Sequence, residues 1–351
     1  MLNQIGCDPF AGETEESHPN PFRSRLSGAR ARLGDVTTSA PVAAIDIGTN
    51  TVKLLIVDGT GTYIARRATT VRLGEGVDTS GRLSDAAIAR TLEALGDFRS
   101  ELDLHNVEVC QVFATSASRD AFNRAEFFSA VAQVLGREPE LLSGAEEGRL
   151  SWKGGTRWAT PRSNNYGEPL YDLLIDIGGG STEFVVGQPG EEPVGVWSVN
   201  IGHVRMTEQF LRIDPPDPVE LSGLVTVLHA YLDDVERELP MVKQADRLIG
   251  VAGTIKTIAA VEIGMPTYDR ARLHKFELTR PAVEDVFRTL ATESHADRAF
   301  NPGLPAGRVK TIVAGTAILA TIMRHFAFDL CVVSESDILD GAVSELLLRQ
   351  M

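Results

Sequence analysis

Two aspartates occupy matching places in the sequence and could hold a cation between them. Asp46 lies in AAIDIG and Asp176 in LLIDIG, each near the end of an apolar run that is typical of a buried strand. A carboxylate in such a place is costly unless a positive charge compensates it. For one copy, capping of turn amides would be explanation enough. For two matching copies we expect a shared divalent ion, Mg²⁺ or Mn²⁺, which prefers carboxylate and phosphate oxygens.

A turn rich in small residues follows each aspartate. Gly178, Gly179 and Gly180 precede Ser181 after the second aspartate, and GTNT follows the first. Because such a turn has few Cβ atoms, its successive N–H groups can converge on an anion, and phosphate is the anion we expect. The run is not a dinucleotide-binding motif, since TEFVVG continues as a strand, and no GxxxxGK[ST] loop occurs in the sequence.

A third glycine element precedes a predicted helix in the second half of the chain. Gly253 and Thr254 come just before IKTIAA, and the N-terminus of a helix binds anions. Lys256 follows within the same helix. We therefore expect Gly253, Thr254 and Lys256 to contact a further phosphate group.

Two glutamates are candidate general bases for hydrolysis of a phosphoanhydride. Glu147 lies in SGAEEGRL, and Glu183 directly follows the glycine-rich turn. The reaction needs a water in line with the bond, a group that orients or deprotonates it, and cations at the phosphate oxygens. Spacing alone also fits Glu146 and Glu147 as a solvated helix start. Arg119, whose planar guanidinium suits phosphate, fits a surface arginine equally well.

Charge and composition exclude several classes of partner. The 351 residues carry 34 Lys and Arg against 48 Asp and Glu, and the net charge of −14 repels polyanions from most of the surface, so we expect no nucleic-acid partner. The three cysteines are widely spaced, and the sequence has neither a long apolar run nor a secretory signal. We expect a cytoplasmic protein with no membrane partner and with water as the nucleophile.

The predicted elements form two related halves. VAAIDIG and VKLLIVDG read as two strands joined by a tight turn, and LLIDIGGGSTEFVVG repeats that hairpin, which implies an internal duplication. Between them we predict a helix after Ser84, a strand in NVEVCQVFATSA, a helix over 124–135, and a short strand leading into a turn in PELLSGAEEGRLSWKGG. Strands and helices alternate in the second half, so the sequence predicts an α/β fold with mixed sheets.

The same pattern divides the chain into three segments. Residues 1–40 lack a hydrophobic period and are expected to form a disordered tail. A first domain spans 41–165, with the closing helix at 340–351 as a possible completion, and a second domain spans 166–339. The turn-rich loop TRWATPRSNNYGEP marks the boundary between the two.

Several segments, in this order, resemble the exopolyphosphatase and guanosine pentaphosphate phosphohydrolase (Ppx/GppA) family. They are AAIDIGTNTVKLLIVDG, ATSASRDAFNRAEFF, ELLSGAEEGRLSWKGG, LLIDIGGGSTEFVVG, NIGHVRMTEQF, IGVAGTIKT and KTIVAGTAILATIM. The resemblance implies a duplicated, actin-like (ribonuclease H-like) two-domain fold with the site in the interdomain cleft, and a homodimer. It also indicates a short form without the C-terminal helical domain of longer members, which puts processivity on long chains in doubt.

The resemblance also implies a role for each candidate residue. Glu147 matches the family's catalytic base and Glu183 its partner at the metal and the water, while Asp46 and Asp176 match the metal-side aspartates. The positions that match phosphate contacts are Thr49, Asn50, Arg119, Gly179, Gly180 and Ser181, and Lys256 and Lys310 are further predictions for gripping the phosphate chain.

The expected activity is Mg²⁺-dependent release of orthophosphate from the end of linear polyphosphate. Guanosine pentaphosphate is the alternative substrate, because it presents a terminal phosphoanhydride to the same turns. A small-molecule kinase of the actin-like superfamily is disfavoured, since the Glu147 motif suits water rather than an acceptor hydroxyl. A nucleotide-binding polymer or chaperone-like protein is disfavoured as well, because no substrate-binding extension is readable.

Overall fold

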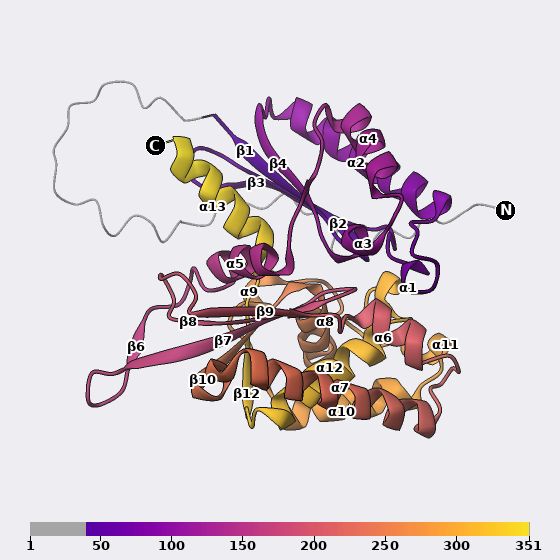
Figure 1. Ribbon diagram of the computed structural model, residues 1–351, viewed down its shortest axis with the longest axis vertical. Coiled ribbons are helices and arrows are strands. Elements are labelled where there is room, and N and C mark those ends of the chain that lie inside the picture. The colour runs from indigo at the N-terminus through magenta and orange to yellow at the C-terminus, as the bar shows by residue number, and fades with distance from the viewer. Residues whose placement is uncertain (1–39, 351) are drawn as a thin grey trace.

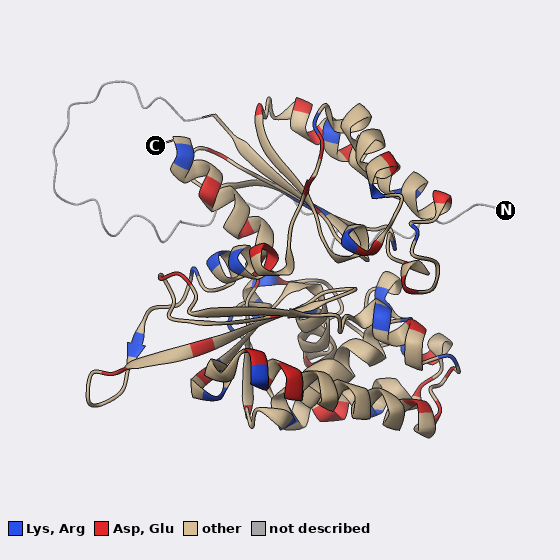
Figure 2. Cartoon of the chain, in the orientation of Figure 1, with Lys and Arg blue, Asp and Glu red and all other residues tan. Residues whose placement is uncertain are grey.

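A computed structural model describes residues 40–350, so the predicted tail lies outside the described residues except for its last position. The described chain forms two lobes, each built on one mixed sheet, and the C-terminal helix lies against the first lobe (Figure 1). Basic and acidic residues are interspersed over the helices of both lobes (Figure 2). Among the described helices, none combines the length and apolarity that crossing a membrane requires.

The first sheet has the strand order β3-β2-β1-β4-β5. Its strands are β1 (Val42–Ile47), β2 (Thr51–Val57), β3 (Tyr63–Thr70), β4 (Val109–Ala114) and β5 (Glu140–Leu141). β1 pairs antiparallel with β2 and parallel with β4. The predicted hairpin and the mixed character of the sheet are therefore confirmed.

The second sheet repeats this order and adds to it. It runs β11-β12-β10-β7-β8-β9, with β6 paired to β7, so that β9-β8-β7-β10-β12 corresponds to β3-β2-β1-β4-β5. Its strands are β6 (Arg162–Ser163), β7 (Pro169–Ile177), β8 (Thr182–Gly187), β9 (Gly195–Val199), β10 (Ala245–Val251), β11 (Glu277–Thr279) and β12 (Leu330–Val333). The matching strand order is the structural form of the duplication seen in the sequence.

Two helices of the first lobe, α2 (Asp85–Leu104) and α4 (Arg124–Leu135), begin where the sequence predicted, and the short helices α1 (Val77–Ser80) and α3 (Ser116–Asp120) were not predicted. The Ser84 hydroxyl accepts a hydrogen bond from the Ala87 N–H and caps α2. α2 and α4 bury their apolar residues in one cluster with side chains of β1, β2 and β4.

The second lobe carries most of the remaining helices. They are α6 (His203–Phe210), α7 (Pro218–Glu238), α8 (Ala252–Ile263), α9 (Arg270–Leu273), α10 (Arg280–Thr292), α11 (His295–Arg298) and α12 (Ile312–His325), with 3₁₀ turns at Pro240–Gln244 and Ala306–Arg308. α7 begins at Pro218, and the Asp217 side chain caps it by accepting a hydrogen bond from the Val219 N–H. These helices share the largest apolar cluster with the second sheet.

Helices α5 (Gly144–Gly155) and α13 (Ile338–Gln350) pack against each other between the lobes. α13 also covers β1 and β2 of the first sheet, while α5 contacts β8 and β9 of the second. The prediction of a turn at SGAEEGRLSWKGG is wrong, because this segment forms α5. The packing of α13 on the first sheet supports its inclusion in the first domain, and the domain boundaries themselves stay a prediction.

Candidate active site

The two strand aspartates line one pocket between the lobes. Asp46 is the second-last residue of β1 and Asp176 the second-last residue of β7. Both side chains are nearly buried, yet both line the same pocket of about 60 Å³. Burial raises the pKa of each carboxyl group, which is the cost expected for a charge removed from water. The fold therefore brings the duplicated carboxylates together, as their spacing predicted.

A lysine that the sequence analysis did not single out compensates Asp46. Lys53 in β2 lies opposite Asp46 in the hairpin, and its Nζ is 3.0 Å from the Asp46 Oδ2. Asp176 instead accepts a hydrogen bond from the Ser151 hydroxyl at 2.6 Å, and it lies opposite Glu183 in the second hairpin. Lys53 follows Asp46 at the same spacing at which Glu183 follows Asp176. This equal spacing was the signal in the sequence that could have identified the lysine.

The start of α6 engages carbonyl groups of the glycine-rich turn. The backbone N–H groups of residues 203–205, at the start of α6, donate to the carbonyls of Gly178 and Gly179 at 2.9–3.2 Å. Within the described part of the chain, the N–H groups of Gly179 and Gly180 have no hydrogen-bond acceptor. Because both residues line the pocket, their N–H groups are available to an anion there.

The matching turn of the first lobe is held in the same way. The Thr49 carbonyl accepts a hydrogen bond from the Gly74 N–H at 2.8 Å, and the Asn50 carbonyl accepts from the Val71 and Arg72 N–H groups at 3.0 Å each. Thr49 and Asn50 both line the pocket. Both turns are also closed by the same backbone bond, from the Gly48 N–H to the Thr51 carbonyl at 3.2 Å and from the Gly178 N–H to the Ser181 carbonyl at 2.9 Å.

The two turns touch across the boundary between the lobes. A Cβ atom placed on Gly179 would lie 2.8 Å from the Thr49 Cβ and 3.3 Å from the Asn50 backbone nitrogen. Contacts at that distance would push the lobes apart, so this position needs glycine. The glycines that suggested a phosphate turn thus also allow the close approach of the two lobes.

Glu147 lies buried at the N-terminal end of α5 and lines the pocket. Ser143 and Glu146 form a capping box that starts this helix, which points Glu146 to solvent and Glu147 inward. The solvated helix start is thus correct for Glu146 and wrong for Glu147. Burial raises the pKa of Glu147 to about 7, against the opposing effect of Arg119, whose Nη1 lies 2.8 Å from the Glu147 Oε2.

Arg119 connects residues of both lobes. It donates to the Leu142 carbonyl at 2.9 Å, to Glu147, and through Nη2 to the Ser181 hydroxyl at 3.3 Å. The alternative reading of a surface arginine is therefore wrong, since the guanidinium is tied to three partners beside the pocket.

Glu183 is fully buried behind the pocket rather than on its wall. Its Oε1 accepts a hydrogen bond from the Ser198 hydroxyl at 2.8 Å, and its Oε2 has no partner in the described part of the chain. Burial, Glu147 and Asp176 together raise the pKa of Glu183 well above its ordinary value. The two glutamates therefore compete to carry negative charge in one small region.

The start of α8 reaches the pocket as expected, and two unpredicted residues accompany it. Gly253 and Thr254 line the pocket, although the Thr254 hydroxyl donates to the Ile177 carbonyl at 2.8 Å. Arg308 also lines it and lies against Gly253. His203 is buried in the same wall, where burial and then Arg308 lower its pKa to about 3, so the imidazole is neutral. Neither Arg308 nor His203 lies in a sequence pattern that indicated a role at this site.

Most of the predicted site residues therefore line this pocket, whereas Lys256 and Lys310 do not. The predicted residues that line the pocket are Asp46, Thr49, Asn50, Glu147, Asp176, Gly179, Gly180, Ser181, Gly253 and Thr254. Lys256 lies outside its lining and faces Asp337 at 3.6 Å and Glu335 at 3.9 Å. Lys310 is exposed and lies 3.6 Å from Glu75.

A model of the Ppx/GppA phosphatase family matches residues 55–350. The chain belongs to this family. As a member, it is a hydrolase of phosphoanhydrides, with the actin-like fold of two mixed sheets described above. The family match includes all pocket-lining residues from β4 onward, while Asp46, Thr49 and Asn50 precede it.

Individual relatives agree with this placement. The chain is 37% identical over 321 residues to exopolyphosphatase 2 of Mycobacterium tuberculosis, which covers 87% of this chain and 98% of that protein. It is 26% identical over 308 residues to the guanosine-5'-triphosphate,3'-diphosphate pyrophosphatase of Aeromonas salmonicida, covering 87% of this chain and 59% of that protein. A crystal structure of an exopolyphosphatase-like protein superposes with a TM-score of 0.82 at 31% identity, covering 89% of this chain and all of that one.

Proposed function

We propose that this protein is an exopolyphosphatase that releases orthophosphate from the end of linear polyphosphate. The observation that carries the proposal is the position of Glu147, a buried carboxylate on the wall of a pocket that the turns at Thr49–Asn50 and Gly179–Ser181 also line. A terminal phosphate held by the free N–H groups of these turns would lie beside a base. The name of the M. tuberculosis relative, which this chain matches over nearly its full length, supports polyphosphate as the substrate.

In the proposed reaction, Glu147 accepts a proton from water as the water oxygen attacks the terminal phosphorus. The bond from that phosphorus to the bridging oxygen breaks, and the products are orthophosphate and a chain shortened by one phosphate. A pKa of about 7 suits a base that must be unprotonated near neutral pH yet accept a proton in the transition state. Arg119 holds the Glu147 carboxylate in place from the side of Ser181.

Asp46 and Asp176 would hold the divalent cation, and the residues present suit one. The Asp46 Oδ1 is buried and has no hydrogen-bond partner in the described part of the chain. Carboxylate oxygens are the ligands that Mg²⁺ and Mn²⁺ prefer, and the bound ion would neutralise charge on the phosphate oxygens. Lys53 already carries part of this compensation at the Asp46 Oδ2. The choice of metal, like the homodimer, is a prediction for solution measurements.

Guanosine pentaphosphate is the second substrate to test. It ends in the same phosphoanhydride, and the A. salmonicida relative is named for a reaction on this nucleotide. The proposed contacts of the pocket are with the terminal phosphate, which both substrates share, so they do not distinguish the two substrates.

Orthophosphate release from polyphosphates of graded length and from guanosine pentaphosphate, measured side by side with Mg²⁺ and with Mn²⁺, tests the proposal. Glu147→Gln should lower turnover by about 10²- to 10⁴-fold, the usual cost of losing a general base. Glu146→Gln is the matched control, because glutamine also serves in a capping box and Glu146 faces solvent. Equal turnover in wild type and Glu147→Gln would reject Glu147 as the base, and transfer of phosphate to an acceptor in place of its release would favour the kinase.

A further inference from the structure

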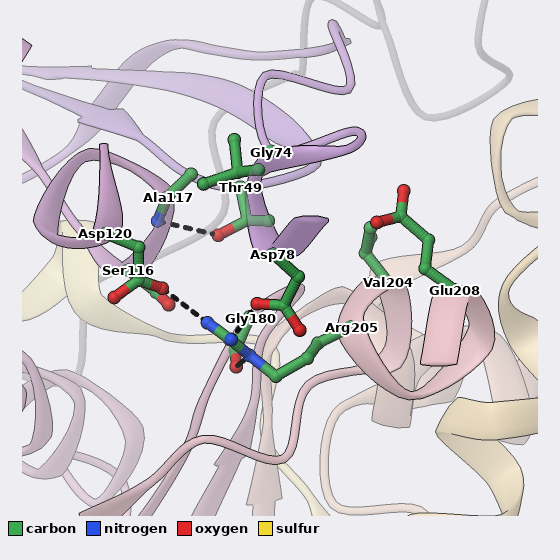
Figure 3. Close-up of a pocket in the computed structure, with 11 residues that line it drawn as sticks. Thr49, Gly74, Asp78, Ser116, Ala117, Asp120, Gly180, Val204, Arg205 and Glu208 are labelled. Carbon is green, nitrogen blue, oxygen red and sulfur yellow. Dashed lines mark hydrogen bonds and ion pairs between the residues drawn. The ribbon is translucent and has the colours of Figure 1, made fainter. Parts of the chain in front are cut away.

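Arg205 joins the two lobes at the edge of the pocket. It lies in the first turn of α6, and its side chain is only 14% exposed. Figure 3 shows the guanidinium extending from α6 to Asp78, Asp120 and Gly180. Nε donates to the Gly180 carbonyl at 2.8 Å, Nη1 is paired with Asp78, and Nη2 is paired with Asp120.

Other contacts of α6 reinforce this junction. Glu208 accepts hydrogen bonds from the Gly76 N–H through both carboxylate oxygens, at 3.1 and 3.2 Å, and Gln209 donates to Asp78. Residues 76 and 78 belong to the first lobe, at the start of α1. One face of a short helix in the second lobe is therefore tied to the first lobe through three side chains, which we call the α6 latch: Arg205, Glu208 and Gln209.

The α6 latch lies beside a second bridge that belongs to the catalytic group. Arg119 directly precedes Asp120, and Ser181 directly follows Gly180. The inner bridge runs from Arg119 to Ser181 at 3.3 Å, and the outer bridge runs from Asp120 through Arg205 to Gly180. The pair Arg119–Asp120 of the first lobe is thus connected to the pair Gly180–Ser181 of the second lobe by two separate bridges.

The two bridges differ in strength. The inner contact is one 3.3 Å hydrogen bond from a guanidinium to a neutral hydroxyl. The outer bridge joins a guanidinium to two carboxylates and a carbonyl, so two of its bonds have a charged donor and a charged acceptor. The guanidinium of Arg205 also restricts the directions from which its partners can accept hydrogen bonds, because its donors lie in one plane. The outer bridge therefore ties Gly180 to Asp120, the direct neighbours of Ser181 and Arg119.

We propose that Arg205 is a positioning residue that sets the alignment of Arg119, Glu147 and the Gly180–Ser181 turn when the lobes are together. It contacts the turn through the Gly180 carbonyl and is not among the residues that line the pocket beside Glu147, so it acts on the substrate only through the turn. This proposal rests on the proposed hydrolytic role of Glu147. Its consequence is that turnover depends on Arg205, while binding of the terminal phosphate does not.

Kinetics of Arg205→Gln and Arg205→Lys test the proposal. Arg237→Gln is the control, because Arg237 is exposed on α7 and pairs with Asp234 and Glu238 of the same helix. We expect kcat to fall by about tenfold or more in both Arg205 variants, because small displacements of reacting groups are costly, with KM within about twofold of wild type. Asp120→Asn should lower kcat as well, and the double variant with Arg205→Gln should be no worse than the more impaired single one. A rise in KM with unchanged kcat, or additive losses, would overturn the proposal.

Hydrogen–deuterium exchange supplies a readout that does not need activity. In Arg205→Gln, the amides of residues 74–81 and of residues 178–182 should both exchange faster than in wild type, and the Arg237→Gln control should match wild type. Unchanged exchange in both segments would overturn the α6 latch even if the enzyme is active. A wild-type protein that releases no phosphate from either substrate would instead reject the proposed function, and the exchange experiment would still decide the latch.

Discussion

Lys53 and Glu183 occupy the same position in the two repeats and carry opposite charges there. Lys53 lies opposite Asp46 in the first hairpin, and Glu183 lies opposite Asp176 in the second. The first repeat therefore supplies a nearly buried ion pair, and the second supplies two facing carboxylates. Like charges across a strand pair are destabilising, so the second hairpin trades stability for an acidic wall beside the pocket.

Lys53→Met should destabilise the protein, because it leaves Asp46 nearly buried without its ion pair. Removing one partner of a buried pair typically costs about 3–5 kcal/mol of unfolding free energy. Added Mg²⁺ should then raise the melting temperature of Lys53→Met more than that of wild type, since a cation at Asp46 replaces the missing charge. Thermal denaturation with and without Mg²⁺ measures both effects, and a variant as stable as wild type without metal would contradict this role of Lys53.

Glu183→Gln should stabilise the protein while impairing it. The pKa of Glu183 is raised by burial, Glu147 and Asp176, so it lies above the value of the unfolded chain. A carboxyl group of this kind stabilises the fold fully at pH values below its unfolded pKa, and that stability is lost as the pH rises through the folded pKa. At neutral pH the amide avoids this loss, and one unit of pKa shift corresponds to about 1.4 kcal/mol.

At neutral pH, Glu183→Gln should therefore have a higher melting temperature and a lower turnover than wild type. The difference in melting temperature should become smaller toward acidic pH. Glu93→Gln, an exposed change on α2, is the control and should alter neither property. A lower melting temperature for Glu183→Gln at neutral pH would contradict this prediction, because the amide oxygen can still accept the Ser198 hydrogen bond and only the charge is lost.

The sequence predicted the hairpins and their aspartates because the signals are local and occur twice. Apolar residues, a turn of small residues and a second apolar run lie within one short segment, and the repeat of that segment confirms the pattern. The pocket residues of both turns follow from this alone. Their partners from α6 and from residues 71–74 could not be predicted, because those contacts depend on how separate segments come together.

Helix α5 was missed because its glycines argue against a helix locally and are needed by distant packing. A Cβ atom on Gly154 would lie 2.8 Å from the Gly341 nitrogen of α13, so the glycine allows the two helices to approach closely. The partner comes near the end of the chain and gives no local signal. The position of Lys256 outside the pocket lining could not be predicted for the same reason, since Asp337, which it faces, also belongs to the C-terminal segment.

Lys310→Ala should have little effect on turnover, whereas Glu147→Gln should nearly abolish it. The lysine side chain is 55% exposed and pairs loosely with Glu75, and exposed pairs contribute about 0–1 kcal/mol. Apparent affinity for polyphosphate should therefore change by no more than a few-fold. Initial rates at saturating and at limiting substrate separate the two effects, and a large loss of kcat in Lys310→Ala would place this residue in the catalytic group.

The pH profile of kcat/KM should depend on Arg119 through its charge. Glu147 must be unprotonated to accept a proton, so activity should rise with pH through the pKa of about 7 and then level off. Arg119 lowers this pKa by its charge and by its hydrogen bond to the carboxylate. Arg119→Gln removes the charge, so the pKa of Glu147 should rise and the acid limb of the profile should move to higher pH.

The measurement is orthophosphate release from about pH 5 to pH 9 at fixed metal concentration, compared between wild type, Arg119→Gln and the control Arg149→Gln. Arg149 is exposed on α5, so its loss should leave the limb in place. Ionisation of the substrate contributes equally to all three profiles, and the difference between them therefore reports on the enzyme. An acid limb that stays fixed or moves to lower pH in Arg119→Gln would show that the limb belongs to a group other than Glu147, because loss of a neighbouring cation can only raise the pKa of a carboxyl group.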